Sequence, residues 1–401
     1  MGREIWTDEF LDRARREGDA LADATVADIF ARGDRVAVND AFDLLLRNDR
    51  LPRETLPPEL LNFLDTTETL PDWADRKLIA RSEQFFLSWG LLSLVSLAAA
   101  ALPECYTLGD EARVLGITRR LTALARRRIL ETAQFTVRVM NTGGLTSGRG
   151  VRAAQTVRLL HATMRKLILA APPAEAHTRP PENHAEAMRF FAWPQENGVP
   201  ISQELLAYTL LTFSYVVPRS LAHFGAHVSE EDWRAHLHHW NIVGHVLGLR
   251  RDLMAETKEE AAWLFAKIKR RRQADTSEGR ELTKSVLDWL TEMLPFRWLA
   301  WLPPLITWML LEPETAKMLG VPTPGWCKRT MVAVYRALPS LLKPNFVLGR
   351  WFVFHATTLQ RGWERELFDL PDSLQAEWSV KTKEPKSASA TPPADPFKNQ
   401  K

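Results

Sequence analysis

The stretch RGVRAAQTVRLLHATMRKLIL, residues 149–169, decides the fold and contains the first candidate for a functional site. Its apolar side chains recur three and four positions apart, which is the spacing of one face of a helix. A histidine on such a face is commonly a hydrogen-bonded core residue, but it can also reach into a cofactor pocket, so both interpretations of His161 stay open. The apolar stripe consists of Val157, Leu160, His161, Met164 and Ile168.

A second stripe of the same helix carries polar side chains. A guanidinium, an amide and a hydroxyl occupy positions i, i+3 and i+4 of this stripe, in the form of Arg152, Gln155 and Thr156. Such a ladder either faces water or lines a binding site. The spacing predicts that the three side chains share one side of the helix, and it does not choose between these two surroundings.

Helical periodicity recurs along almost the whole chain, whereas alternating or β-branched runs bounded by turns are nearly missing. The sequence therefore predicts an all-α protein, with one large multi-helix domain built around an apolar central helix and a cofactor or ligand pocket. Ser202 and Ser229 each stand directly before an apolar-periodic segment with acidic residues in its first turn, so both are expected to cap helix N-termini.

The expected domain organisation follows from these patterns and from changes in composition. A proline-rich loop is expected at 171–187, and a tail without apolar periodicity, expected to be disordered, begins at residue 381. No linker of comparable composition divides residues 30–370. The predicted parts are an N-terminal helical segment (1–59), a main helical domain (60–300), a C-terminal helical extension (301–380) and the tail (381–401).

Two apolar segments raise the question of a membrane. The charge-free run 85–103 reaches the lower edge of bilayer-spanning length, yet its small residues and serines suit a helix surrounded by other helices, which is the interpretation we favour. The segment 296–313 combines three tryptophans with a Pro-Pro break. It is expected to be a packing segment, a substrate entrance or a patch in a membrane interface.

Charge and cysteine content exclude several classes of function. The 52 basic and 49 acidic residues nearly cancel, and the basic runs 119–128 and 269–272 are separate, so we expect helix faces or local ion pairs and no nucleic-acid partner. Two cysteines give no disulfide framework, and the charged N-terminus does not resemble a secretion signal. The expected location is cytoplasmic, with peripheral membrane association as an option; the oligomeric state is not predicted.

Histidines concentrate in HLHHWNIVGHVLGLRRD, residues 236–252. No HExxH pattern accompanies them, so a zinc site is weakly supported. A neutral imidazole on an apolar helix suits a single axial bond to haem iron, and the glycine next to His245 allows a flat ring to approach the backbone. His245 is therefore a candidate metal ligand, with a buried, hydrogen-bonded histidine as the alternative. Phosphate-binding glycine loops and a nucleophile elbow are missing from the sequence.

Four segments, in this order, resemble the MpaB and latex-clearing rubber oxygenase family, whose members are helical and contain haem b. The similarity covers roughly residues 60–300, which would make that part the catalytic domain. The resemblance implies an oxygenase that binds O2 at haem iron and cleaves a carbon-carbon double bond in a hydrophobic isoprenoid or lipid-like substrate. The segments are ETAQFTVRVM (131–140), GRGVRAAQTVRLLHATMR (148–165), GVPISQELLAYTLLTFSYVV (198–217) and WNIVGHVLGLR (240–250).

The resemblance also implies roles for individual residues. Arg152, Gln155 and Thr156 match an Arg-x-x-Lys-Thr cluster on the distal side of the haem, with Gln155 in place of the lysine. Arg152 would then stabilise negative charge on bound oxygen, and Thr156 would donate or relay a proton. Glu131 would serve as an acid or base near the substrate, or else form an ion pair with a neighbouring arginine of its helix.

The family's proximal histidine has no counterpart at the matching position, which falls at or beside Leu211. The resemblance therefore leaves His245 as the first choice for the iron ligand and His161 as the second. The alternative is a non-catalytic helical protein that binds apolar ligands and has lost haem. A third hypothesis, a membrane-associated scaffold, depends on the two apolar segments.

Overall fold

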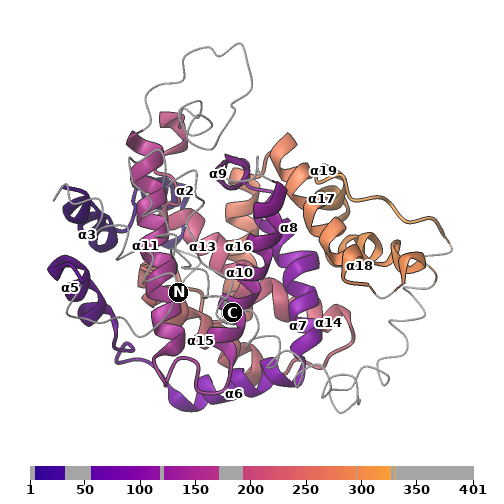
Figure 1. Cartoon of the computed structure of the whole chain (residues 1–401). Coiled ribbons are helices and arrows are strands. Elements are labelled where there is room, and N and C mark those ends of the chain that lie inside the picture. Colours follow the sequence, from indigo (N-terminus) through magenta and orange to yellow (C-terminus); the bar gives the residue numbers. More distant parts are fainter. Residues whose placement is uncertain are drawn as a thin grey trace, which may run out of the picture.

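The computed structural model describes residues 5–31, 56–117, 122–170, 193–294, 296–326 and 330. Throughout these ranges the chain forms helices and no strand, which confirms the predicted all-α fold (Figure 1). The predicted loop at 171–187 and the predicted tail at 381–401 lie outside the described residues.

The α-helices follow one another with short connections. They are α2 (Asp8–Arg15), α3 (Ala20–Ala31), α5 (Pro58–Thr67), α6 (Arg76–Ser88), α7 (Gly90–Ser96), α8 (Leu102–Cys105), α9 (Gly109–Ile117), α10 (Thr122–Met140), α11 (Arg149–Ala170), α13 (Gln203–Leu211), α14 (Val217–His223), α15 (Glu230–Val246), α16 (Lys258–Arg272), α17 (Ser277–Glu292), α18 (Leu302–Leu310) and α19 (Pro313–Met318).

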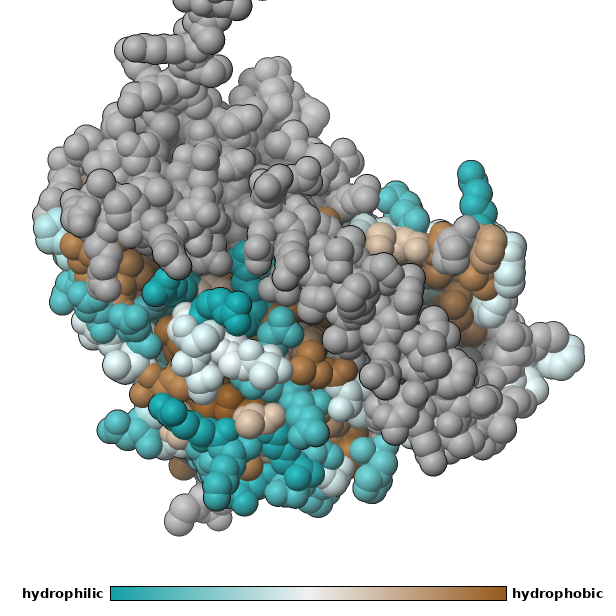
Figure 2. Space-filling model, turned by 60° about the horizontal axis from the view of Figure 1, so that its bottom comes forward, coloured by the Kyte–Doolittle hydropathy of each residue, from teal (hydrophilic) through white to brown (hydrophobic). Residues whose placement is uncertain are grey.

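The helices form a bundle around α10, α11, α13 and α15. The N-terminal helices α3 and α5 cover the outer side of α11, while α17, α18 and α19 lie on the opposite side of the molecule (Figure 1). On the face shown in Figure 2, hydrophilic and hydrophobic side chains of the described residues are interspersed. The long helix α11 therefore has one side toward the N-terminal helices and another toward the interior of the bundle.

Two π-helical turns interrupt the apolar helices. Leu97–Ala101 joins α7 to α8, and Thr212–Val216 joins α13 to α14. Residues 203–223 consequently form one continuous helix, Gln203–His223, that is long and apolar enough to cross a membrane, although 72% of its most apolar window is buried inside the protein. The predicted core helix at 85–103 is divided at Trp89: its first residues belong to α6, and the following segment, Gly90–Cys105, is bent by 87° against α6. All five residues of Leu97–Ala101 are buried.

The predicted helix caps are present. Ser202 Oγ accepts a hydrogen bond from the Leu205 amide at 3.4 Å. Ser229 Oγ accepts from the Asp232 amide at 3.1 Å, and the Asp232 carboxylate accepts from the Ser229 amide at 3.1 Å, so the two residues form a capping box. The beginnings of α13 and α15 are thus fixed by local sequence.

The basic run 269–272 forms ion pairs, which is one of the two surroundings expected for it. Lys269 Nζ lies 2.9 Å from the buried Glu104 carboxylate. Arg271 bridges Glu204 at 3.1 Å and Asp12 at 2.5 Å, so this arginine ties α2 to α13 and α16.

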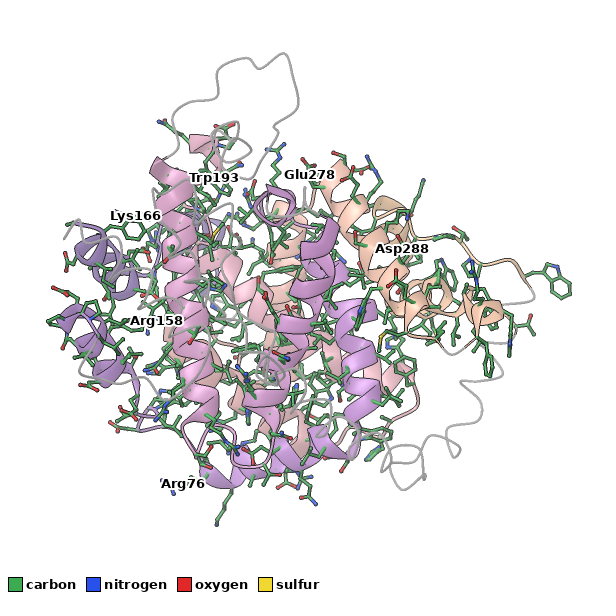
Figure 3. The ribbon with its side chains drawn as sticks, viewed as in Figure 1. Arg76, Arg158, Lys166, Trp193, Glu278 and Asp288 are labelled. Carbon is green, nitrogen blue, oxygen red and sulfur yellow. The ribbon has the colours of Figure 1, made fainter. Side chains whose placement is uncertain are left out.

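A buried ion pair attaches the N-terminal helices to α11. Arg158 Nη2 lies 2.8 Å from Asp19 Oδ1, and both side chains are almost completely buried. Figure 3 shows Arg158 on α11, on the side of the N-terminal helices. Gly248 packs against the same ion pair and has a φ of +87°, which favours glycine. A Cβ at this position would lie 2.2 Å from Asp19 Oδ2, so any other residue would displace the Asp19 carboxylate.

Replacing Asp19 by asparagine tests this attachment. Asparagine can still accept the Ala22 amide hydrogen bond that Asp19 Oδ1 accepts at 3.3 Å, so the variant removes mainly the charge. Removing one partner of a buried ion pair leaves the other charge uncompensated and costs about 3 kcal/mol or more. We expect Asp19→Asn to lower the free energy of unfolding, measured in urea, by about this amount.

The matched control is Asp288→Asn on α17, far from the pair (Figure 3). Asp288 pairs with Lys284, and their side chains are 57% and 75% exposed, so the loss should stay below about 0.5 kcal/mol. Equal losses in the two variants would contradict a special role for the buried pair.

Two fully buried histidines of α15 join helices of the core. His239 Nε2 lies 2.9 Å from the Val139 carbonyl oxygen, and His236 Nε2 lies 3.3 Å from the Phe213 carbonyl oxygen. These distances require N–H groups on both rings. Burial lowers the pKa of His236 to about 3 and the pKa of His239 to about 4, so both rings are neutral at pH 7.

The low pKa values predict an acid-dependent loss of stability. In the unfolded chain these histidines titrate near pH 6.5, so below that pH the unfolded state binds protons that the folded state excludes. Stability contributed by the neutral rings is complete above pH 6.5 and falls as the pH drops toward 4, by about 2 kcal/mol per histidine at pH 5. His239→Gln should reduce the slope of unfolding free energy against pH between 6.5 and 4.5. Parallel curves for the variant and the original protein would show that His239 does not titrate in this way.

Candidate functional site

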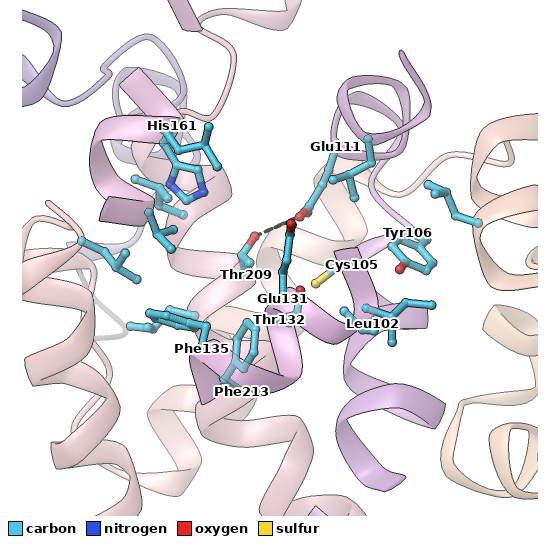
Figure 4. A pocket seen from close by; sticks show the side chains of 18 of the residues that line it. Leu102, Cys105, Tyr106, Glu111, Glu131, Thr132, Phe135, His161, Thr209 and Phe213 are labelled. Carbon is cyan, nitrogen blue, oxygen red and sulfur yellow. Dashed lines mark hydrogen bonds between the residues drawn. The ribbon is translucent and has the colours of Figure 1, made fainter. Parts of the chain in front are cut away.

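An apolar cavity of about 240 Å³ lies inside the bundle. Helices α8, α9, α10, α11, α13, α15 and α17 contribute to its wall, so segments far apart in the sequence meet here (Figure 4). Most lining side chains are aliphatic or aromatic. The apolar wall includes Leu102, Leu115, Ile129, Phe135, Val157, Leu160, Leu206, Leu210, Phe213, Trp240, Leu247, Leu249, Leu282 and Val286.

His161 lines this cavity from α11. Val157 and Leu160, neighbours of His161 on the predicted apolar stripe, line it too. The structure thus places the imidazole at the cavity wall, where it is half-buried, among side chains that exclude water. It is the sole histidine among the described lining residues.

Carboxylates line another part of the cavity. Glu131 comes from α10 and Glu111 from α9, and Figure 4 shows both side chains directed toward Thr209 of α13. The Thr209 hydroxyl oxygen lies 3.3 and 3.4 Å from the two carboxylate oxygens of Glu111. Glu131 therefore shares the cavity with His161.

Glu111 and Thr209 were not among the residues predicted from the sequence. Glu111 is the third residue of α9, where an acidic side chain is normally explained by the dipole of the helix N-terminus. Thr209 lies on a helix whose apolar pattern surrounds it. Neither position carries a sequence signal that separates it from an ordinary helical residue.

The polar stripe of α11 faces away from the cavity. Gln155 Nε2 donates to the Leu64 carbonyl at 2.9 Å and to Thr67 Oγ1 at 2.8 Å, both on α5. Arg152 is exposed, and Thr156 Oγ1 donates to the Arg152 carbonyl at 3.0 Å. Arg152 precedes His161 by nine residues, which is about two and a half helical turns, so the two side chains leave opposite sides of the helix.

Leu211 is buried and does not line the cavity, whereas the preceding residue, Leu210, does. Leu210 lies against Gly244 of α15: a Cβ at Gly244 would be only 2.7 Å from Leu210 Cδ2. At this wall the cavity is therefore closed by an aliphatic side chain that fits over a glycine.

His245 lies outside the residues that line the cavity. Its side chain is exposed and makes an edge contact with Trp73, with ring centroids 6.0 Å apart. The Arg251 guanidinium covers the same tryptophan at 4.2 Å. Because Gly244 faces the cavity, the next residue is turned by about 100° around the helix and reaches the surface. The structure thus separates His245 from Glu131 and brings His161 and Glu131 into one site.

Comparison with known proteins assigns the family. A model of the family described as "ER-bound oxygenase mpaB/B'/Rubber oxygenase, catalytic domain" matches residues 84–343, which is more than half of the chain. The chain belongs to this family. The resemblance expected from the four sequence segments is thereby confirmed, and all four segments lie within the matched range.

Individual relatives agree with this assignment. A curated relative from Streptomyces sp. (strain K30), named "Rubber oxygenase", is 26% identical over 287 residues. The alignment includes 69% of this chain, which spans about 64% of the length of that relative. A solved structure of latex clearing protein LCP in the closed state matches with a TM-score of 0.67 and 22% identity, covering 92% of this chain and 88% of that chain. The second match shows the same fold.

Proposed function

We propose that this MpaB and rubber oxygenase family member is a haem b-dependent oxygenase that cleaves a carbon-carbon double bond in a hydrophobic isoprenoid substrate, with O2 as co-substrate. The observation that carries the proposal is the shared cavity: an imidazole and a carboxylate line one apolar chamber within the part of the chain that matches the family. The names of the relatives support an isoprenoid as substrate.

One donor group of the cavity, the His161 imidazole, is of the kind that binds haem iron. A single neutral imidazole on an apolar helix is a common proximal ligand of haem iron, and His161 offers it. The flat aromatic side chains of Phe135, Phe213 and Trp240 provide an apolar surround. The present volume is below the roughly 300–1,000 Å³ of pockets for drug-sized ligands. Binding of a porphyrin would therefore require the cavity to widen.

The protein's own residues would have distinct tasks in such a reaction. The haem, when bound, supplies the O2 binding and the redox chemistry. His161 would hold it, the apolar walls would bind the isoprenoid chain and exclude water, and the Glu131 carboxylate would accept or return a proton at its Oε atoms. The positions of Arg152 and Thr156, on the far side of α11, give no support to their predicted contact with bound oxygen.

The second candidate function is a non-catalytic protein that binds apolar ligands and has lost haem. One observation favours it: aliphatic residues, Leu210 and Leu211, occupy the place where the family's proximal histidine was expected. The two candidates share the cavity and differ in the cofactor. Haem binding by the purified protein therefore decides between them.

Expression with supplied haem, followed by an absorption spectrum and a pyridine haemochrome assay, tests the proposal. We expect a red-brown protein with a Soret band, and carbonyl products when the protein is incubated with an isoprenoid in air. His161→Ala should lose the Soret band, because it removes the imidazole of the cavity.

His245→Ala is the matched control, since it removes an imidazole that faces the surface beside Trp73. This variant should keep the pigment. Retained pigment in His161→Ala together with loss in His245→Ala would move the iron ligand to α15. A colourless original protein after haem supplementation would overturn the oxygenase proposal and favour the apolar binder.

A further inference from the structure

We propose that one apolar surface of this protein lies in the interface of a lipid bilayer, with neutral phospholipid as its partner. This apolar face is formed by the outer sides of α7 and α18 and by the segment that leads into α18. The proposal goes beyond the proposed function and does not depend on haem. The apolar face comprises Leu91, Leu94 and Val95 of α7, Leu302 and Ile306 of α18, and Met293, Phe296 and Trp298.

The fold brings two nearly charge-free segments of the sequence together. Residues 85–103 contain no charged residue, and residues 293–311 contain only Arg297. Helix α18 packs against Leu97–Ala101, the π-helical turn that continues α7. Figure 1 shows α7 and α18 on the same side of the molecule, away from α3 and α5. The two apolar segments whose sequences raise the question of a membrane therefore meet on one side of the protein.

Helix α7 has an inverted amphipathic pattern. Ser93 and Ser96 are buried, whereas Leu91 is 38% exposed and Leu94 and Val95 are half-buried. A helix whose outer side faces water normally directs its leucines inward and its polar residues outward. In helices that face lipid, serine and other small residues lie at the contacts with neighbouring helices. The pattern of α7 is therefore that of a helix whose outer side contacts lipid.

Helix α18 repeats this pattern, because Thr307 is buried while Leu302 and Ile306 are half-buried. Within the described part of the chain, the hydroxyl oxygens of Ser93, Ser96 and Thr307 have no hydrogen-bond partner. Burial of an unpaired hydroxyl is unfavourable, and exposure of aliphatic side chains to water on the other side of the helix adds to the cost. Contact with lipid would remove that aliphatic surface from water and so favour the orientation in which the hydroxyls point inward.

The segment before α18 adds exposed aromatic side chains to the apolar face. Trp298 is 70% exposed, and its ring stacks on that of the exposed Phe296 with the centroids 6.1 Å apart. Tryptophan is enriched at the boundary between headgroups and hydrocarbon, because its ring is apolar and its N–H can donate a hydrogen bond. The side chain of Arg297 is long enough to keep its guanidinium at the headgroups while its stem lies along apolar groups. This combination suits a bilayer interface.

The chemistry of the apolar face favours lipid over a protein or an anionic surface. Protein interfaces form about one hydrogen bond per 100–200 Å², whereas the Trp298 indole N–H is the one strong donor among the side chains of this face. Attraction to anionic headgroups depends on clusters of lysine and arginine, and Arg297 stands alone between residues 293 and 311. Neutral phospholipid should therefore be sufficient for binding.

Flotation of the full chain with phosphatidylcholine vesicles tests the proposal. We expect the protein to float with the vesicles at low and at high NaCl concentration alike, because burial of apolar groups is not screened by salt. Full burial of a large apolar side chain corresponds to a change in partition coefficient of about tenfold or more. Trp298→Ser should therefore lower the vesicle partition coefficient by about tenfold.

A matched pair of leucines locates the effect. Leu91 on α7 and Leu21 on α3 are 38% and 37% exposed, so serine removes a similar apolar area at either position. Leu91→Ser should lower the partition coefficient by about threefold or more, whereas Leu21→Ser, on the side of the N-terminal helices, should leave it unchanged (Figure 1). Thermal unfolding followed by circular dichroism identifies any variant that is not folded, and Phe296→Ser takes the place of Trp298→Ser in that case.

Several results would overturn the proposal. They are failure of the original protein to float, equal losses for Leu91→Ser and Leu21→Ser, and flotation that disappears at high NaCl concentration. Sedimentation velocity without lipid adds a further test: a dimer that Trp298→Ser dissociates would assign the apolar face to a second copy of the chain and overturn the lipid assignment. Vesicle binding by a colourless protein would overturn haem dependence and leave the membrane surface supported.

Discussion

The arrangement of the molecule depends on the buried ion pair between Arg158 and Asp19. It holds the N-terminal helices against one side of α11, at the turn where Gly248 closes the end of α15. A buried guanidinium needs a carboxylate partner, so this side of α11 has only one favourable orientation. His161 follows Arg158 by three residues and is therefore turned by about 60° around the helix, where it lines the cavity.

The cavity follows from this orientation. Residues of α11 that face inward line the chamber together with residues of α10 and α13, and its wall contains an imidazole, two carboxylates and mostly apolar side chains. In such surroundings a polar side chain interacts strongly with a polar or charged partner, because little water competes for that interaction. The same environment that stabilises the fold by apolar burial therefore makes His161, Glu111 and Glu131 the groups with the strongest influence on a bound ligand.

The other buried histidines of the core have a structural role and do not line the cavity. His236 and His239 are neutral and bridge helices through backbone carbonyl oxygens, so they are explained by packing. His245, two turns further along α15, reaches the surface beside Trp73. The histidine-rich segment 236–252, predicted to hold a possible metal ligand, thus contains histidines in structural and surface positions, and the histidine of the cavity comes from another helix.

The sequence by itself determined the helical fold class, the caps at Ser202 and Ser229 and the apolar stripe that includes His161, because each depends on residue spacing within a segment. Four of its segments also resembled the family that the comparison confirmed. It also singled out Glu131. Only the tertiary structure decided that Gln155 contacts α5, that Leu210 rather than Leu211 reaches the cavity, and that Glu111 and Thr209 belong to the site. Helical periodicity shows which side chains share a face, whereas the partner of that face is set by long-range packing and by buried pairs such as Arg158 with Asp19.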